Sequence, residues 1–324
     1  MSLVSVIIPA YNSESSLSQC IDSVLNQSYK PVQIIVINDG STDRTVEIAK
    51  SYGEQIHYIE QENKGQGAAR NAGLKVATGE FIAFLDSDDY WEQDFLINCV
   101  NFLNINPDIS AVFTSYAKQY SNGTSEIRPA IAASESCQKK GPQILNSFYK
   151  FWADHYYIQT GAVVISSKVI KLAGGMREDL RISQDLEYWS HIANHGRWGF
   201  IPIPLLISTS EKVVPKGGWV KKYSNRRKLC PTVEQWQSRI INNITKENMP
   251  YFKVIRGKIA AGYLYAKISA GDNAGAKHII NKYKNEMPLN SLTKWGRRFQ
   301  NMGTLSWNIF CWLVRFRESM KAFR

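Results

Sequence analysis

The chain has 324 residues, of which 44% are hydrophobic and 21% are charged. This length and composition exclude a disordered tail and a small disulfide-stapled scaffold, and they predict one large domain with an appendage. The five cysteines are odd in number and lie far apart without a C-x-x-C pair, which argues against a disulfide framework or a zinc cluster and indicates a reducing, cytoplasmic environment.

The net charge of +11 is distributed unevenly. Residues 216–324 carry 22 basic and 5 acidic side chains, a net charge of +17, whereas residues 1–215 carry a net charge of −6. Such asymmetry is typical of a chain whose basic part meets an anionic partner, either nucleic acid or an anionic membrane surface. We therefore expect a folded domain over residues 1–215 and a basic, mainly helical region over residues 216–324.

Strand-like and helix-like segments alternate through the first hundred residues. This alternation predicts an α/β fold with a mostly parallel sheet and helices on both of its faces. In the first helix the apolar residues follow the spacing of one buried face, so this helix should pack on the sheet. Strands are expected at residues 4–9, 32–38, 56–60 and 81–85, and helices at 15–26, 42–52, 65–76 and from Trp91 onward.

After residue 104 the pattern loosens, and a second ordered block follows. Residues 208–225 contain Gly217-Gly218 and four lysines, which predicts a mobile loop. From Thr232 onward the sequence reads as helical, and Gly271-Asp272 should form the turn of a helical hairpin. The block is expected to contain helices at 144–157 and 183–194, strands at 162–166 and 198–203, and the hairpin helices at 251–270 and 273–285.

The last thirty residues combine aromatic and basic side chains. The apolar stretch from Leu305 to Val314 is about half of the roughly 20 residues needed to span a bilayer, so it predicts no membrane-crossing helix. Aromatic residues flanked by cations suit a segment that lies in the interface of an anionic leaflet. A helix packed on its own domain, with its arginines in solvent, explains the pattern equally well.

At the N-terminus the sequence enters a predicted strand at once, so we expect no secretory signal.

An apolar run followed by acids, Phe81 to Leu85 and then Asp86-Ser-Asp-Asp89, is the first candidate for a ligand site. Open α/β sheets bind ligands just outside the carboxyl ends of their strands. Asp86 and Asp88 are two residues apart, so on an extended backbone both would face one side and could share a divalent cation or a ribose. A lone D-x-D is more often an acidic turn that caps the next helix, and Asp89 suits that role as well as it suits the site.

Four other segments place polar side chains where strands end or helices begin. The first strand ends at Pro9 and delivers Tyr11 to the edge of the sheet, and Asp39 follows the second strand. The sequence Lys64-Gly-Gln-Gly precedes a helix that presents Arg70 and Asn71, and Asp185 opens an amphipathic helix after a Gly-Gly-Met-Arg segment.

In their order and spacing these five segments resemble the family-two inverting glycosyltransferases, which use nucleotide sugars and have the GT-A fold. The resemblance covers roughly residues 3–210. It implies a metal-dependent enzyme, with Mn²⁺ or Mg²⁺, that moves a sugar from a nucleotide-diphosphate donor, a UDP-sugar, to an acceptor hydroxyl in bacterial surface polysaccharide or glycan biosynthesis. The implied partners are that donor and a glycan or lipid-linked glycan acceptor, with no nucleic acid.

The resemblance also implies roles for individual residues. Tyr11 would stack on or flank the nucleobase, Asp39 would accept a hydrogen bond from it, and Pro9 would belong to the same nucleotide-binding set. Arg70 would lie near the base or the diphosphate, although a helix-surface arginine is the alternative. Asp86 would bind the ribose or the outer shell of the metal, and Asp88 would coordinate the metal between the two phosphates.

Asp185 would be the catalytic base, and its alternative is an N-terminal helix acid favoured by the dipole. The sequence departs from the family at two places. Relatives have a Glu-Asp pair where this chain has Gln184-Asp185. Many relatives also carry an Arg or His after the following strand, and here only Lys212, Lys216 or a later basic residue could replace it. His191 and His195 are interpreted as helix-surface residues, and Trp189 as a core or acceptor-platform residue.

Two other classes of nucleotide-binding enzyme lack their motifs here. The first strand is not followed by G-x-G-x-x-G, and there is no Walker sequence. The remaining alternative is a non-catalytic protein that binds nucleic acid or an anionic membrane through its basic half, on a glycosyltransferase-like scaffold. The joint presence of Asp39, Asp86, Asp88 and Asp185 favours the enzyme, placed in the cytoplasm at the inner face of the cell membrane.

Overall fold

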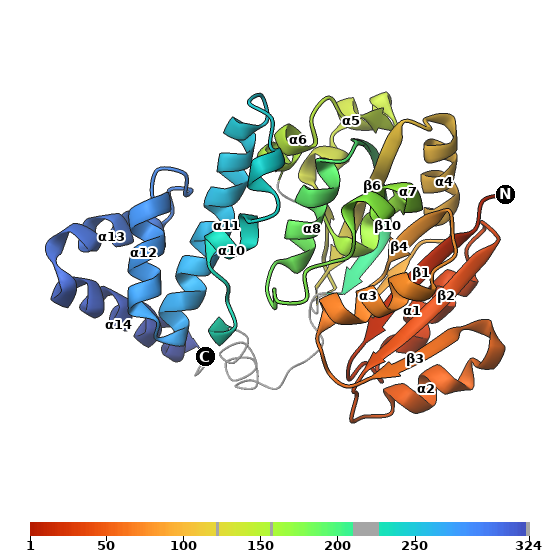
Figure 1. Ribbon diagram of the computed structural model, residues 1–324, viewed down its shortest axis with the longest axis horizontal. Coiled ribbons are helices and arrows are strands. Elements are labelled where there is room, and N and C mark those ends of the chain that lie inside the picture. Colours follow the sequence, from red (N-terminus) through yellow and green to blue (C-terminus); the bar gives the residue numbers. More distant parts are fainter. Residues whose placement is uncertain (121–122, 156–157, 210–226, 322–324) are drawn as a thin grey trace. The chain divides into compact units, whose positions relative to one another are not determined.

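The computed structural model describes residues 1–120, 123–155, 158–209 and 227–321. The chain divides into two compact units. The sheet unit comprises Met1–Asp179 and Gln184–Lys212, and the helical unit comprises Leu180–Ser183 and Val213–Arg324. Figure 1 shows the strands gathered in the first unit, and helices making up the described residues of the second.

The sheet unit is built on one mixed sheet with the strand order β3-β2-β1-β4-β9-β6-β10-β5. The first four strands are parallel neighbours, as their sequence pattern predicts: β1 (Val4–Ala10), β2 (Val32–Asp39), β3 (His57–Gln61) and β4 (Phe81–Phe84). The expected α/β class is confirmed. The second half of the sheet is less regular, because β9 (Val163–Ser166) enters antiparallel between β4 and β6 (Ile109–Gln119).

The long strand β10 (Arg197–Thr209) organises the far half of the sheet. It runs parallel to β6 and antiparallel to β5 (Asp89–Trp91) and β8 (Gln143–Ile144), while β7 (Ser125–Arg128) pairs with β6. The strand predicted at residues 198–203 is therefore longer than expected, and it includes Ser208 and Thr209 of the predicted mobile loop. The rest of that loop lies outside the described residues.

Helices cover both faces of the sheet. The even-numbered apolar residues of β1 belong to one buried cluster together with α1 (Leu17–Leu25) and α4 (Phe95–Ile105). Ile7 points to the opposite face, because successive strand residues alternate. There it meets α3 (Gln66–Val76), whose Gly73 lies so close that a β-carbon would come within 2.5 Å of Ile7 Cγ2. Since both faces are covered, every residue of β1 is buried.

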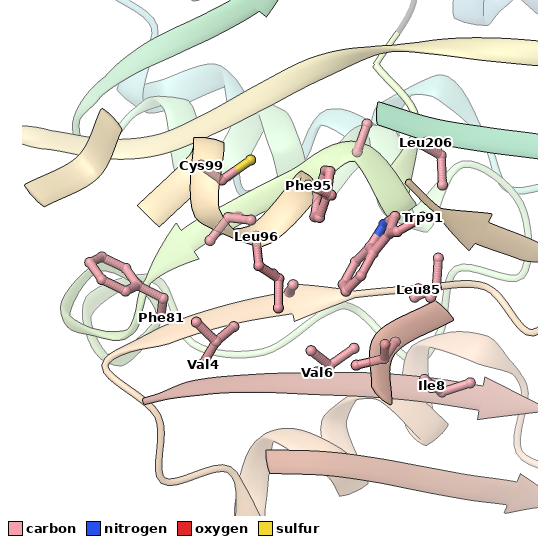
Figure 2. Close-up of a cluster of buried hydrophobic side chains, with 14 of the residues drawn as sticks. Val4, Val6, Ile8, Phe81, Leu85, Trp91, Phe95, Leu96, Cys99 and Leu206 are labelled. Carbon is pink, nitrogen blue, oxygen red and sulfur yellow. The ribbon is translucent and has the colours of Figure 1, made fainter. Parts of the chain in front are cut away.

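Figure 2 shows the cluster on the α1 and α4 side, where Val4, Val6 and Ile8 lie beneath aromatic side chains. The rings of Trp91 and Phe95 stack with their centroids 4.3 Å apart, and Trp91 Nε1 donates to the carbonyl of Gly161 at 2.6 Å. The prediction that a helix begins near Trp91 is wrong. This residue ends β5, because pairing with β10 and burial of the indole hold the backbone extended, and α4 begins at Phe95.

Three of the remaining described helices of the sheet unit lie close to their predicted positions, and two others were not predicted from the sequence. The helix expected at 144–157 is shorter, because residues 143–144 pair with β10 as β8, and its last two predicted residues lie outside the described ranges. All five cysteines of the chain are buried and free, in agreement with the expected lack of disulfides. The three predicted helices are α2 (Thr45–Ser51), α6 (Phe148–His155) and α8 (Gln184–Ala193). The two helices that were not predicted are α5 (Glu135–Lys140) and α7 (Ser167–Ala173), and 3-10 turns lie at Gly53–Gln55, Ala130–Ala133 and Thr160–Ala162.

The helical unit confirms the predicted hairpin. Helices α11 (Met249–Ala270) and α12 (Asn273–Tyr283) are separated by Gly271, whose φ of 86° is the left-handed conformation that ends many helices. Asp272 then caps α12 by accepting a hydrogen bond from Gly275 N at 2.8 Å. The unit also contains α10 (Val233–Gln237), α13 (Ser291–Phe299), α14 (Thr304–Lys321) and 3-10 turns at Ile241–Asn243 and Gln300–Met302. Among the described helices, none is long and apolar enough to cross a membrane.

The segment Leu180–Ser183 belongs to the helical unit although it directly precedes α8. Trp236 Nε1 donates to the carbonyl of Ser183 at 3.3 Å, and the hydroxyl of Tyr263 donates to the carbonyl of Ile182 at 3.4 Å. Trp236 is itself fully buried and stacks on Phe252. Ser183 has a positive φ of 58°, which is uncommon for a residue with a β-carbon. The backbone of Ile182 and Ser183 is thus held by contacts that are remote in sequence.

The close approach of α3 to the sheet gives a first prediction. The substitution Gly73→Ala should lower the free energy of unfolding by about 1–3 kcal/mol, because the added methyl group overlaps Ile7 and Ile37. The matched control is Gly262→Ala within α11, where a β-carbon meets nothing within 4 Å, so the variant should be unchanged or more stable by up to about 1 kcal/mol. Urea denaturation of both variants measures the difference, and equal stabilities would contradict the close packing.

Candidate functional site

Three of the predicted site segments meet at one edge of the sheet. Strands β1 and β2 are in parallel register from Val4↔Val32 to Ala10↔Asn38, and β4 lies on the other side of β1. Their carboxyl ends therefore share one edge, where Tyr11, Asp39 and the acidic turn follow. Pro9 is buried in β1, whereas the side chain of Tyr11 is 49% exposed. An aromatic ring is thus available to a ligand at the edge where α/β sheets bind nucleotides.

Asp39 fixes the loop that leads into α3. Its side chain is buried, and its Oδ1 accepts hydrogen bonds from Gln61 Nε2 at 2.7 Å and from the backbone N–H of Lys64 at 2.8 Å. Its Oδ2 accepts from the backbone N–H of Gly65 at 2.8 Å, where the chain turns with a φ of 88° to start the helix. A carboxylate can accept about four hydrogen bonds. Gln61, Lys64 and Gly65 use three of these positions, so about one remains for a ligand.

Arg70 is buried, and only 1% of its surface is exposed. The interpretation of Arg70 as a helix-surface residue is therefore wrong, because the small residues of α3 bring this helix against the sheet. Its guanidinium forms an ion pair with Asp86, with 2.5 Å between Nη2 and Oδ1, and Nη1 lies 3.9 Å from the sulfur of Met176. The Nε atom is buried and has no hydrogen-bond partner among the described residues.

The acidic residues lie in a turn between β4 and β5. The backbone N–H of Asp89 donates to the carbonyl of Asp86 at 2.9 Å, which closes the turn. The expected extended backbone from Asp86 to Asp88 is therefore wrong, because the chain must reverse within four residues to pair with β10. Asp86 contacts Arg70, whereas Asp88 is exposed and its carbonyl accepts a hydrogen bond from the hydroxyl of Thr209.

Asp89 is the third acid of the turn and is almost fully buried, with 4% of its surface exposed. Burial is the largest cause that raises its pKa, the charges of Asp86 and Asp88 act in the same direction, and together they bring the pKa to about 8. Its carboxyl group accepts from Gln159 Nε2 at 3.3 Å and from the backbone N–H of Thr209 at 3.2 Å. Asp89 does not cap a helix, since α4 begins after Asp94. It joins β10 to the acidic turn.

Asp185 lies in the first turn of α8 and is partly exposed. The hydroxyl of Thr160 lies 3.5 Å from its Oδ2. The preceding Gln184 is buried and donates from Nε2 to Gln66 Oε1 at the start of α3, at 3.2 Å. Gln184 thus faces into the protein, while the neighbouring carboxylate stays accessible.

The other residues of α8 are mostly structural. Trp189 is fully buried and lies 6.3 Å from Phe84 between ring centroids, which makes it a core residue. His191 is also buried, with its Nε2 3.0 Å from the carbonyl of Ala173. The expectation that His191 lies on the helix surface is therefore wrong, because α7 packs over it. His195 is exposed, as expected.

Asn71 connects the two sides of the site, and its role was not predicted from the sequence. Its Nδ2 donates to the carbonyl of Met176 at 2.9 Å, and its Oδ1 accepts from the N–H of Met176 at 2.8 Å. A β-carbon at Gly175 would lie 2.5 Å from that oxygen, so a glycine is required beside the amide. The only signals in the sequence were the adjacency of Asn71 to Arg70 and the Gly174-Gly175 pair.

The carboxylates fit a cation that arrives with a diphosphate. Within the described ranges no three His, Cys, Asp or Glu side chains cluster as a metal cage. Asp86 is paired with Arg70 and burial favours the neutral form of Asp89, whereas Asp88 is the most exposed of the three acids. One or two carboxylates with substrate phosphates are the usual protein ligands of Mg²⁺. Lys212 and Lys216, the candidates for a phosphate contact, lie outside the described residues.

The geometry agrees with the family comparison, in which Glycosyl transferase family 2 matches residues 5–172. The chain belongs to this family. Among curated family members, residues of this chain are 50% identical over 96 positions to glycosyltransferase GlyA of Streptococcus pneumoniae serotype 4, covering 29% of this chain and 14% of GlyA. An uncharacterized glycosyltransferase of Rickettsia typhi, RT0329, is 35% identical over 191 residues, covering 58% of this chain and 57% of that one. The matches therefore span 14% of the length of GlyA and 57% of the length of RT0329.

Solved structures show that the family fold is the GT-A fold. Staphylococcus aureus TarS 1–349, solved in complex with UDP-GlcNAc, matches 98% of this chain and 92% of its own with a TM-score of 0.62 at 17% identity. The mannosyltransferase PcManGT of Pyrobaculum calidifontis, solved with GDP-Man and Mn²⁺, matches 97% of this chain and 87% of its own with a TM-score of 0.56 at 18% identity. The fold expected from the sequence is therefore confirmed.

The raised pKa of Asp89 predicts a pH-dependent stability. The folded state holds this proton up to about pH 8, whereas an unfolded aspartate loses it near pH 4, so the contribution of Asp89 to stability falls as the pH rises between these values. The slope is at most about 1.4 kcal/mol per pH unit. Asp89→Asn should remove this dependence of stability on pH. The free energy of unfolding of the variant should therefore rise relative to that of the wild type as the pH increases from about 4 to about 8.

Urea denaturation in the presence of a chelator, repeated across this pH range, measures the effect. Glu92→Gln is the matched control, because Glu92 is an exposed acid three residues away and should leave the slope unchanged. Parallel pH profiles for the wild type and Asp89→Asn would show that Asp89 is ionised in the folded protein.

Proposed function

We propose that the protein is an inverting glycosyltransferase that moves a sugar from a nucleotide-diphosphate donor, a UDP-sugar, to an acceptor hydroxyl. The observation that carries this proposal is that α3 connects both halves of one site. Arg70 pairs with the acidic turn after β4, while Asn71 and Gln66 hold the segment and the helix that present Asp185. A donor bound over the turn would then lie in reach of a base on α8.

The donor half would bind a nucleoside through groups of distinct chemistry. The exposed ring of Tyr11 offers a flat face to the base, and the remaining acceptor position of Asp39 offers an edge partner. Pro9, buried in β1, fixes the backbone that leads to Tyr11. We assign the ribose to Asp86, whose Oδ1 is held by Arg70. The solved TarS complex with UDP-GlcNAc supports a uridine donor, and PcManGT with GDP-Man shows that this fold also binds guanosine donors.

The diphosphate would be bound by Asp88 through Mn²⁺ or Mg²⁺ and by Arg70. When bound, the cation would offset the negative charge that develops on the departing diphosphate. The Mn²⁺ in the PcManGT complex supports this assignment. Arg70 contributes a fixed positive charge at the same edge through its ion pair with Asp86.

Asp185 would act as the general base. Its carboxylate takes the proton of the acceptor hydroxyl while that oxygen forms a bond to the anomeric carbon. The bond from this carbon to the donor phosphate breaks on the opposite side, and its electron pair leaves with the nucleoside diphosphate. A single displacement of this kind inverts the anomeric configuration. The hydroxyl of Thr160, 3.5 Å from Asp185, is placed to orient the carboxylate.

We assign the reaction to bacterial surface polysaccharide or glycan synthesis, with a glycan or lipid-linked glycan as acceptor at the cytoplasmic face of the membrane. The net charge of +17 on residues 216–324 supports an anionic partner such as a lipid diphosphate carrier. Membership of a glycosyltransferase family favours catalysis over a non-catalytic nucleic-acid binding protein.

The base assignment predicts that Asp185→Asn retains donor binding and loses transfer. General base catalysis supplies about 10² to 10⁴ in rate, so turnover should fall at least about a hundredfold. Calorimetry with UDP-sugars and a coupled assay for released nucleoside diphosphate measure the two quantities. Asp154→Asn, at an exposed acid on α6, is the control. Turnover like that of the wild type in Asp185→Asn would remove this residue from the mechanism.

The metal assignment predicts that Asp88→Ala abolishes the gain in donor affinity that Mn²⁺ gives. Glu92→Ala removes the same charge from a nearby exposed position and should keep the gain. Donor binding is measured by calorimetry with Mn²⁺ and again with chelator. If Asp88→Ala and the wild type respond to Mn²⁺ alike, Asp88 is not the metal ligand.

A further inference from the structure

Helix α14 has two apolar faces, and only one of them is used for packing. The buried face contains Trp307, Phe310 and Cys311. Trp307 Nε1 donates to the carbonyl of Asn273 at 2.8 Å, and the ring of Phe310 stacks on Phe299 with 5.4 Å between centroids. These contacts hold α14 in the helical unit, in which Figure 1 shows α13 and α14 as the last two helices.

The second apolar face is open to solvent. It is formed by five apolar residues between Leu305 and Phe316, which are between 46% and 76% exposed. Successive members are four, three, one and three residues apart, and this spacing places them on one side of a helix. Trp312 and Phe316 stack within this face, with 5.3 Å between ring centroids. We call this surface the α14 stripe, and it consists of Leu305, Ile309, Trp312, Leu313 and Phe316.

The exposed charges on α13 and α14 are mainly basic. Arg317 on α14 and Lys294 and Arg298 on α13 are exposed. Trp295 on α13 is 51% exposed, and the guanidinium of Arg298 lies 5.7 Å from the centre of its ring. Helix α13 contains no acidic residue, and the one acid in the sequence of α14 is Glu318.

We propose that the α14 stripe inserts into the headgroup region of an anionic lipid membrane, with α14 lying in the plane of the surface. An exposed aromatic and aliphatic face on a helix that carries exposed cations and no exposed acid among its described side chains is the pattern of interfacial helices. The charges select this occupant over a second copy of the chain, because two such faces would bring like charges together. This inference deepens the proposed function, on which it rests for the lipid-linked acceptor, by naming the surface that would reach it.

Sedimentation with lipid vesicles tests the proposal without using the transfer reaction. The full chain should bind phosphatidylcholine vesicles that contain about 30% phosphatidylglycerol and should not bind pure phosphatidylcholine vesicles, because the cations need anionic headgroups. The double variant Ile309→Ser, Trp312→Ser should lose at least about tenfold in vesicle affinity. Both side chains are about half exposed, so the variant should keep its fold.

The matched control is Val254→Ser, Leu289→Ser, which changes two exposed apolar residues elsewhere in the helical unit and should bind vesicles like the wild type. Thermal stabilisation by UDP-sugars with Mn²⁺, measured on every variant, reports the donor site separately. Equal vesicle binding by the stripe variant and the wild type overturns the proposal. The proposal is also overturned if the wild type does not bind vesicles but forms a dimer, or a complex with single-stranded DNA, that only the stripe variant loses. The stripe would then be the contact surface for that partner.

Discussion

The site depends on the buried ion pair between Arg70 and Asp86. A guanidinium that is 1% exposed is costly to bury unless an opposite charge lies beside it, and Asp86 supplies that charge at 2.5 Å. The pair can form because Gly73 lets α3 approach β1 and β2 closely. The next residue, Asn71, binds the backbone of Met176 on the segment that leads toward α8. One helix thereby fixes the acidic turn and the approach to Asp185.

The acids of the turn differ because their surroundings differ. Asp86 is paired with Arg70, Asp88 faces solvent, and Asp89 is buried with its pKa raised to about 8 by desolvation and by the two neighbouring charges. The turn therefore carries less negative charge at neutral pH than its sequence suggests. It concentrates the accessible charge on Asp88, where a cation between phosphates would meet it.

The helical unit has two features that follow from different parts of its sequence. It holds Leu180–Ser183 through Trp236 and Tyr263, and α8 begins directly after this segment. It also exposes the α14 stripe while the opposite face of α14 packs inward. The packed helix expected from the C-terminal sequence describes one face of α14, and the interfacial helix that we propose would use the opposite face.

The sequence by itself determined the α/β class, the strands from β1 to β4, the helical hairpin and the family, because apolar periodicity, turn glycines and short motifs are local signals. It also identified the polar residues that follow β1, β2 and β4. Only the tertiary structure decided that residues 89–91 form a strand, that Arg70 and His191 are buried and that Asn71 holds Met176. Burial, ionisation and pairing depend on residues distant in the chain, such as β10 for Asp89 and β1 for α3, so no local pattern could have specified them.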